Sequence, residues 1–416
     1  MKVNTNSGRM KAMILKVIIL PLKVLMGIMV FFIFLISMQH LFGRIYYFQA
    51  PQPFRGEQLY NPYAQTAGTW YKANLHAHGK AHFGLTNGEQ AGKAVLEKYE
   101  SMGYDIAAIS DYHSVNAEQN IEDPSFIPVY EHGYSFIKSH RLAIGSEKVN
   151  WFDLSLPLLT SHKQFILHNM YQHTPVIALA HPKLYNGHSP RDLERLTGYH
   201  LFEVLNHYKN SADYWDIALS AGKPVWLLAN DDSHNIYGKT ETGANWTMIK
   251  SMDTHRETVL RALRAGSAYG VAGLGGVNDN ALESVDIAEN KVSISFVHPA
   301  DSILLVGQHG KIRARVYDSA NISYTFKTDD TYIRAVAYNP KTTMYLNPVI
   351  RYDGEGIPAN TFAASVSPLQ TNFLRAGIIF VYSVVLYFIL GGRIITVRSR
   401  KPSLVLRFNK TTFRVF

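Results

Sequence analysis

The chain has 416 residues, enough for two or three domains, and contains no cysteine, which excludes disulfide bonds. Its 41 Lys and Arg exceed its 32 Asp and Glu, but twelve of these basic residues lie in two terminal tails that contain no acidic residue. Residues 24–392 therefore hold 29 basic against 32 acidic residues, and we expect no nucleic-acid partner. The twelve tail residues are Lys2, Arg9, Lys11, Lys16, Lys23, Arg393, Arg398, Arg400, Lys401, Arg407, Lys410 and Arg414.

Two apolar segments lie next to these basic tails. Residues 25–42 and 376–392 contain no Asp, Glu, Lys or Arg, and each is long enough to cross the hydrocarbon core of a membrane. The alternatives are a cleaved signal peptide for the first segment and a buried core helix for the second. We favour two transmembrane helices. By the positive-inside rule both termini are cytoplasmic, and the intervening residues are periplasmic or extracellular.

These features predict an order of domains along the chain. A Pro-rich, Gly-rich linker leads to the main domain, and short alternating apolar runs after Gly270 indicate a second, all-β domain. The expected boundaries are 1–24 for the basic cytoplasmic N-terminus, 25–47 for the first transmembrane helix and its exit, 48–68 for the linker, 69–272 for the main domain, 280–355 for a small β-sandwich, 373–392 for the second transmembrane helix and 393–416 for the basic cytoplasmic tail, which we expect to lie against membrane lipid.

Within the main domain, predicted strands end at residues of metal-ligand type. His76 and His78 follow the first strand, and in extended chain their side chains point to the same side. The strands are expected at 70–75, 106–109, 141–145, 176–180, 201–205 and 225–229, with helices at 89–102, 163–171, 212–221 and 255–265. The residues that follow the strands are His76 and His78, then Asp111, Glu147, His181, Asn206 with His207, and Asp231 with Asp232 and His234.

Alternating strands and helices predict an α/β fold, and the strand ends of a β/α barrel collect at one face, where sites are built. A lone His-x-His is often a surface coincidence. Six ligand-type positions, each at a strand end, favour a metal site instead. His and carboxylate ligands suit Zn, Mn or Fe better than Ca or Mg.

The order of these motifs resembles the PHP (polymerase and histidinol phosphatase) family of metal-dependent phosphoesterases over residues 69–270. The resemblance implies a distorted (β/α)7-type barrel and two or three divalent metal ions. It also implies a metal-activated hydroxide that hydrolyses a phosphate mono- or diester. The metal ligands implied are His76, His78, Asp111, Glu147, His181, Asp232 and His234. Glu147 would bridge two metals, and Glu147, Asp232 and His234 are the residues that we expect to be catalytic.

One position departs from the family pattern. Tyr112 follows Asp111 where the family usually has a histidine. Either the site holds two metals, or His82 and His113 rebuild a third position; His207 is a further candidate ligand.

The substrate class stays open on the sequence alone. A small or lipid-linked phosphate ester fits an exported domain, as does a phosphodiester in an exported polymer. Two rivals remain: hydrolysis of an amide or another non-phosphate bond, and a metal-stabilised ectodomain that only binds partners. Lys148 and Lys183, beside predicted ligands, are candidate anion-binding residues.

Overall fold

The computed structural model describes residues 6–116, 122–156, 159–389, 398–400, 403–408 and 411–415. These residues form two compact units. One unit comprises Met1–Ile45 with Ser367–Phe416, and the other comprises Tyr46–Val366.

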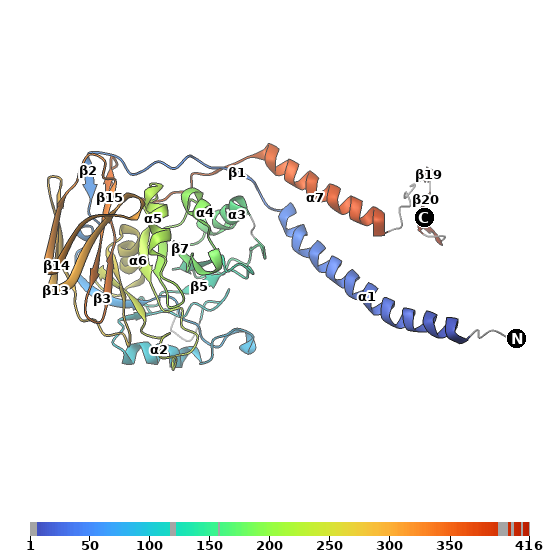
Figure 1. Cartoon of the computed structure of the whole chain (residues 1–416), viewed down its shortest axis with the longest axis horizontal. Helices are drawn as coiled ribbons and strands as arrows, with labels where there is room; N and C mark the ends of the chain where they lie inside the picture. Colours follow the sequence, from blue (N-terminus) through green and yellow to red (C-terminus); the bar gives the residue numbers. More distant parts are fainter. Residues whose placement is uncertain are drawn as a thin grey trace. The chain divides into compact units, whose positions relative to one another are not determined.

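The first unit contains two long apolar helices, α1 (Asn6–Met38) and α7 (Pro368–Ile389), drawn as continuous ribbons in Figure 1. Both are long and apolar enough to cross a membrane, with segments Val24–Leu41 and Pro368–Tyr387 meeting that test by length and composition. Phe34 of α1 and Tyr382 of α7 pack edge to face, with ring centres 4.8 Å apart. Residues 390–392 of the second expected span lie outside the described residues. Three short strands follow: β19 (Arg398–Arg400), β20 (Ser403–Phe408) and β21 (Thr411–Val415).

The second unit is built on two large sheets. The first contains β2 (Gln58–Tyr60), β3 (Thr69–Asn74), β4 (Ile106–Ala107), β10 (Asn245–Ser251), β11 (Ala268–Ala272), β12 (Leu282–Ala288), β13 (Lys291–Gly307), β14 (Lys311–Thr325), β15 (Tyr332–Tyr338), β16 (Thr343–Leu346) and β17 (Val349–Tyr352). Its main path runs β12-β13-β15-β16-β11-β10-β3-β4. The long strands β13 and β14 lie side by side at one edge of this unit (Figure 1).

The second sheet has the order β5-β6-β7-β8-β9, with β5 (Val129–His132), β6 (His140–Ile144), β7 (Val176–Ala180), β8 (Leu201–Leu205) and β9 (Trp226–Ala229). β7, β8 and β9 run parallel, whereas β6 runs antiparallel to both β5 and β7. Every residue of these five strands is buried, which explains why the central ones read as continuous apolar runs rather than alternating patterns.

Helices cover the strands of this unit. They are α2 (Gly92–Ser101), α3 (Thr160–Tyr171), α4 (Pro190–Arg195), α5 (Ala212–Ser220) and α6 (Arg256–Ala265). Short 3₁₀ turns lie at Pro62–Ala64, His82–Gly84, Leu184–Asn186 and Gln308–Gly310, and one more, Gln39–Leu41, follows α1. A two-residue antiparallel pair, β1 (Tyr46–Tyr47) with β18 (Ser365–Val366), joins the two ends of the unit.

Two expectations about the fold need correction. The protein is a mixed α/β structure, but no sheet closes into a barrel among the described residues. The strands expected to form a separate β-sandwich also continue the first sheet, because β16 pairs with β11 from Tyr269↔Leu346 to Ala272↔Thr343. Alternation along β12 to β17 indicated sheet structure correctly, but alternation carries no information on which sheet a strand joins.

Candidate metal centre

The candidate site lies where strands from both sheets end. His76 and His78 follow β3, and Asp232 follows β9. An isolated parallel bridge between Ala77 and Ser233 holds these two chain segments together, and the His78 N–H donates to the Ser233 carbonyl oxygen at 2.8 Å. Residues more than 150 positions apart in sequence therefore face the same point.

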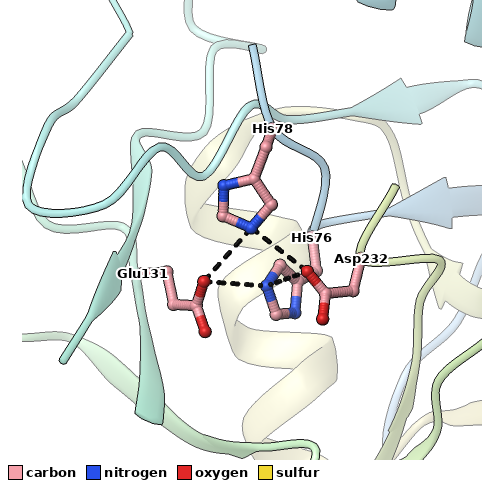
Figure 2. A group of neighbouring side chains, drawn as sticks. All are labelled: His76, His78, Glu131 and Asp232. Atoms are coloured by element: carbon pink, nitrogen blue, oxygen red, sulfur yellow. Dashed lines mark hydrogen bonds and ion pairs between the residues drawn. The ribbon is translucent and has the colours of Figure 1, made fainter. Parts of the chain in front are cut away.

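Four buried side chains converge there: His76, His78, Glu131 and Asp232. Figure 2 shows their nitrogen and oxygen atoms pointing toward one another. The Nε2 atom of His76 lies 3.1 Å from Asp232 Oδ1 and 3.4 Å from Glu131 Oε2. The Nε2 atom of His78 lies 3.1 Å from each of the same two oxygens. All four residues are at most 2% exposed.

The residues fit a divalent metal ion. Ligands bound tetrahedrally at about 2.0–2.1 Å lie roughly 3.4 Å from one another, close to the separations measured between these donors. Two of the facing atoms, His76 Nε2 and Glu131 Oε2, are buried without a hydrogen-bond partner in the described part of the chain. Leaving such atoms unpaired in a protein interior is costly, and a cation between them would satisfy both.

A second group shares Glu131 with the first. The other carboxylate oxygen of Glu131, Oε1, lies 2.5 Å from His140 Nδ1 and 3.0 Å from His181 Nε2. His181 Nε2 also lies 3.8 Å from Asp232 Oδ2. One oxygen of Glu131 thus faces each group, as expected of a carboxylate that bridges two neighbouring cations.

The structure does not bring Glu147 to this cluster. Glu147 follows β6, and its exposed carboxylate pairs with Arg256 Nη1 at 2.7 Å. The reason is the antiparallel direction of β6: its first residue, His140, pairs with Ala180 next to His181, whereas its last, Ile144, pairs with Val176 at the opposite end. The prediction of Glu147 assumed that every strand runs in the same direction.

Sequence reasoning therefore missed Glu131 and His140. Both occupy strands of the β5–β6 hairpin, and β5 had not been predicted. The available signal was Glu131 directly after the apolar run 126–130, since a carboxylate next to core residues is rarely buried unless it is paired or coordinates a metal.

Further buried groups orient the ligands. Glu203 of β8 accepts hydrogen bonds from His76 Nδ1 at 2.9 Å, from the His181 N–H at 2.7 Å and from Asn230 Nδ2 at 3.0 Å. Asn206 Nδ2 donates to Glu203 at 3.1 Å and to Asp232 at 3.2 Å. A carboxylate on the second nitrogen of a histidine fixes the ring and makes it a stronger ligand.

The electrostatics of the cluster are those of a cation site. Burial alone lowers the pKa of His76, but Asp232, Glu203 and Glu131 raise it well above its usual value. Burial likewise opposes the charge on Asp232, yet His76 and His78 hold its pKa well below the usual range. Glu131 and Asp232 are thus ionised. Without a metal ion, protons on His76 and His78 balance this negative charge.

Two further predicted ligands, Asp111 and His234, lie next to this centre. Asp111 is buried beside it and accepts hydrogen bonds from the Gly79 N–H at 2.8 Å and Asn116 Nδ2 at 3.1 Å; burial raises its pKa. The His234 ring stacks on His78 with centres 4.4 Å apart. His234 Nδ1 donates to the Asp232 carbonyl oxygen at 2.9 Å, so its Nε2 carries the lone pair.

His82, His113 and His207 do not join the cluster of His76, His78, Glu131 and Asp232. His82 Nε2 donates to the Tyr112 carbonyl oxygen at 2.8 Å, and His207 Nδ1 contacts the Asp231 carbonyl oxygen. Both ring nitrogens of His113 bond to backbone, one to Asn150 and one to Gly133. His113 instead neighbours His132 and Asp153 in a separate buried group.

Two ligands sit on strained backbone. His181 has a φ of 29° and Asp232 a φ of 53°, in the left-handed region that residues other than glycine seldom adopt. Strain of this kind persists only where the surrounding structure enforces it, and it is concentrated at functional sites. Here it turns both side chains into the cluster directly after their strands end.

Comparison with known proteins does not show a family for this chain. No protein-family model matches the chain, and no curated protein matches it. Among solved structures, the chain is similar to a two-domain protein from Bacteroides vulgatus that contains a predicted PHP-like metal-dependent phosphoesterase. The two are 13% identical, with 77% of this chain and 99% of the other covered and a TM-score of 0.38. A likeness this distant leaves the chemistry to the geometry of the site itself.

Proposed function

We propose that the chain is a membrane-anchored, metal-dependent phosphoesterase. The observation that carries this proposal is the buried quartet of His76, His78, Glu131 and Asp232, whose donor atoms lie 3.1–3.4 Å apart around one point. With the second group around Glu131, the donors suit two divalent ions, and Zn, Mn or Fe fits this mixture of imidazole and carboxylate. We assign hydrolysis to residues 69–272.

A divalent cation at such a site lowers the pKa of bound water and neutralises charge that builds up on phosphate oxygens. The protein residues supply the rest. Glu131 and Asp232 hold negative charge in a buried place, and Glu203 keeps Nδ1 of His76 protonated so that Nε2 faces inward. His234 presents an unpartnered Nε2 within the described part of the chain, and its pKa is lowered to about 4 by burial and by His78. It is therefore neutral at pH 7 and able to accept a proton or to bind metal.

Tyr112 closes one side of the site. Its ring stacks on His78, with centres 4.7 Å apart, and packs edge to face on His140 at 5.7 Å. Burial and then the nearby Glu131 raise the pKa of its hydroxyl above the usual value. A neutral phenol here excludes water from the quartet, and we propose that it takes the place of a third metal ion.

The rest of the assignment concerns location. We propose that α1 and α7 cross the membrane, that both termini are cytoplasmic, and that Tyr46–Val366 is periplasmic or extracellular. The support is the length and apolar composition of the two helices together with the basic tails beside them.

The test is elemental analysis of the purified full chain, paired with hydrolysis of an aryl phosphate monoester and diester. Two bound transition metals and hydrolysis that disappears on chelation and returns with Mn or Zn would support the proposal. Asp232→Ala and His181→Ala should abolish hydrolysis while membrane insertion persists. A chain that binds no metal would refute the assignment, and a metal-loaded chain that cleaves amides but no phosphate ester would redirect it.

A further inference from the structure

The loops around the metal centre carry exposed apolar side chains. They are Phe83, Leu85, Phe136, Trp151, Tyr185 and Tyr237, which we call the apolar rim; each is 64% exposed or more. From this rim we infer that the metal centre works at a bilayer surface, on a phosphate ester carried by a lipid. The inference rests on the proposed function and specifies its substrate class.

The rim belongs to one edge of the molecule because its loops hold one another. His82 in the first loop donates to the Tyr112 carbonyl oxygen, and the Glu89 N–H donates to the carbonyl oxygen of His234, at 2.9 Å. Trp151 stacks on His113 with ring centres 5.5 Å apart. The loop carrying Tyr185 approaches the loop carrying Phe136 so closely that a Cβ on Gly187 would lie 2.4 Å from the Lys138 carbonyl oxygen.

These loops also follow the strand ends that supply the metal ligands. Phe83 and Leu85 come after His78, Tyr185 after His181, and Tyr237 after His234. Phe136 lies in the turn between β5 and β6, which bear Glu131 and His140. The apolar rim and the charged centre are therefore parts of one surface, apolar outside and polar within.

The two ends of the Tyr46–Val366 unit lie at the same edge. The Tyr46 N–H donates to Ser161 Oγ at 3.0 Å, at the start of α3. Thr160, the first residue of α3, donates to Asp192 at 2.7 Å, and Asp192 sits in the first turn of α4, directly after the loop that carries His181 and Tyr185. Since β18 pairs with β1, the chain enters and leaves this unit beside the loops of the metal centre.

This arrangement suits an amphiphilic substrate at an interface. Tyr and Trp prefer the level of lipid headgroups, where one part of the ring is apolar and another is wet. Solvent-exposed apolar residues concentrated around a buried charged site are unusual on a protein that meets only water. A lipid phosphate matches both features of this surface. Its phosphate ester can reach the metal centre, while its acyl chains stay in the bilayer against the apolar rim.

Trp151 gives a readout independent of catalysis. Of the five tryptophans, Trp151 is 64% exposed, whereas Trp215, Trp226 and Trp246 are at most 1% exposed. The full chain would be reconstituted in nanodiscs of phosphatidylcholine with or without brominated acyl chains, which quench tryptophan only on contact. We expect the brominated lipid to quench most of the Trp151 emission, which is the difference in emission between the unmodified chain and the Trp151→Phe variant. The emission of the Trp151→Phe variant should hardly differ between the two lipids. Equal emission of Trp151 in both lipids would overturn the inference that the apolar rim contacts the bilayer.

A rate comparison tests the substrate class. We expect the reconstituted chain to hydrolyse phosphatidic acid at least about tenfold more efficiently than glycerol 3-phosphate. The Phe83→Ser/Tyr237→Ser double variant should lose about tenfold on phosphatidic acid and nothing on glycerol 3-phosphate. The matched control is Tyr317→Ser, a 63% exposed tyrosine of β14, which should change neither rate.

The outcomes distinguish failure of the lipid inference from failure of the proposed phosphoesterase function. Equal rates on the two esters, or a double variant that behaves like Tyr317→Ser, would overturn the lipid inference and leave the phosphoesterase intact. Absence of hydrolysis of every ester with metal bound would defeat the proposed function, and the Trp151 measurement would still decide whether the rim meets the bilayer.

Discussion

Replacing Glu131 with glutamine tests the centre most directly, because this carboxylate faces both groups of ligands. The change keeps the shape of the side chain but removes its charge and one of its two acceptor oxygens. One oxygen currently faces His76 and His78 at 3.4 and 3.1 Å, and the other faces His140 and His181 at 2.5 and 3.0 Å. An amide can serve only one of these pairs as an acceptor.

The expected loss follows from this geometry. Removing a group that merely orients a metal ligand costs about 10–100-fold in metal affinity or activity. Loss of a direct ligand shared by two ions should exceed this, so we expect at least about 100-fold weaker binding of the more weakly held ion, or roughly 2.7 kcal/mol. Elemental analysis after dialysis against a graded chelator measures the loss, and the hydrolysis rate should fall in parallel.

The matched control is Glu147→Gln, the carboxylate that the sequence had indicated. Glu147 is exposed, and its carboxylate pairs with Arg256; surface ion pairs of this kind are worth about 0–1 kcal/mol. Its metal content and activity should match those of the unmodified chain. The reasoning is refuted if Glu131→Gln keeps both metals while Glu147→Gln loses one.

Three further outcomes are expected. Glu203→Gln should weaken metal binding about 10–100-fold without changing the number of ions bound, because Glu203 orients His76 through Nδ1 and the His181 backbone through its N–H; an unchanged chelator titration would contradict this role. Tyr112→His should add one bound ion per chain, since it places an imidazole beside His78 and His140, and elemental analysis that still finds the original number would count against it. Burial, followed by the charge of Arg264, lowers the pKa of His200 from 6.5 to about 4; the unfolded chain therefore gains a proton between pH 7 and pH 5 that the folded chain does not, which removes about 2 kcal/mol of stability. Urea unfolding of the full chain in detergent measures the free energy of unfolding at both pH values. Between pH 7 and pH 5, His200→Gln should lose about 2 kcal/mol less stability than the unmodified chain. An identical pH dependence in the two proteins would disprove the role of His200.

Much of the local structure was predictable from the sequence. The apolar run at 176–180 coincides with β7, and the expected helix at 212–221 ends one residue beyond α5. Such segments are decided by local patterns of burial, which sequence periodicity reports directly. His76, His78, His181 and Asp232 come together because each follows a strand whose direction was inferred correctly.

The rest depended on strand direction and pairing. Periodicity does not reveal that β6 runs against its neighbours, and this one reversal exchanges the expected Glu147 for His140 at the centre. Glu131 was missed because no strand was predicted over Val129–His132. The join between β16 and β11 depends on residues about 75 positions apart, which no local pattern encodes.

The pairing of β2 with β17 has a consequence for biogenesis. Tyr60 pairs with Ile350, and Arg351 donates to the Gly56 carbonyl oxygen, 295 residues earlier in the chain. During synthesis, the edge of β2 stays unpaired until β17, near the end of this unit, has been made. Contacts between such distant residues form slowly, and unpaired strand edges promote aggregation while they persist. Cellular factors that shield nascent chains should therefore limit the yield of this protein more than its final stability does.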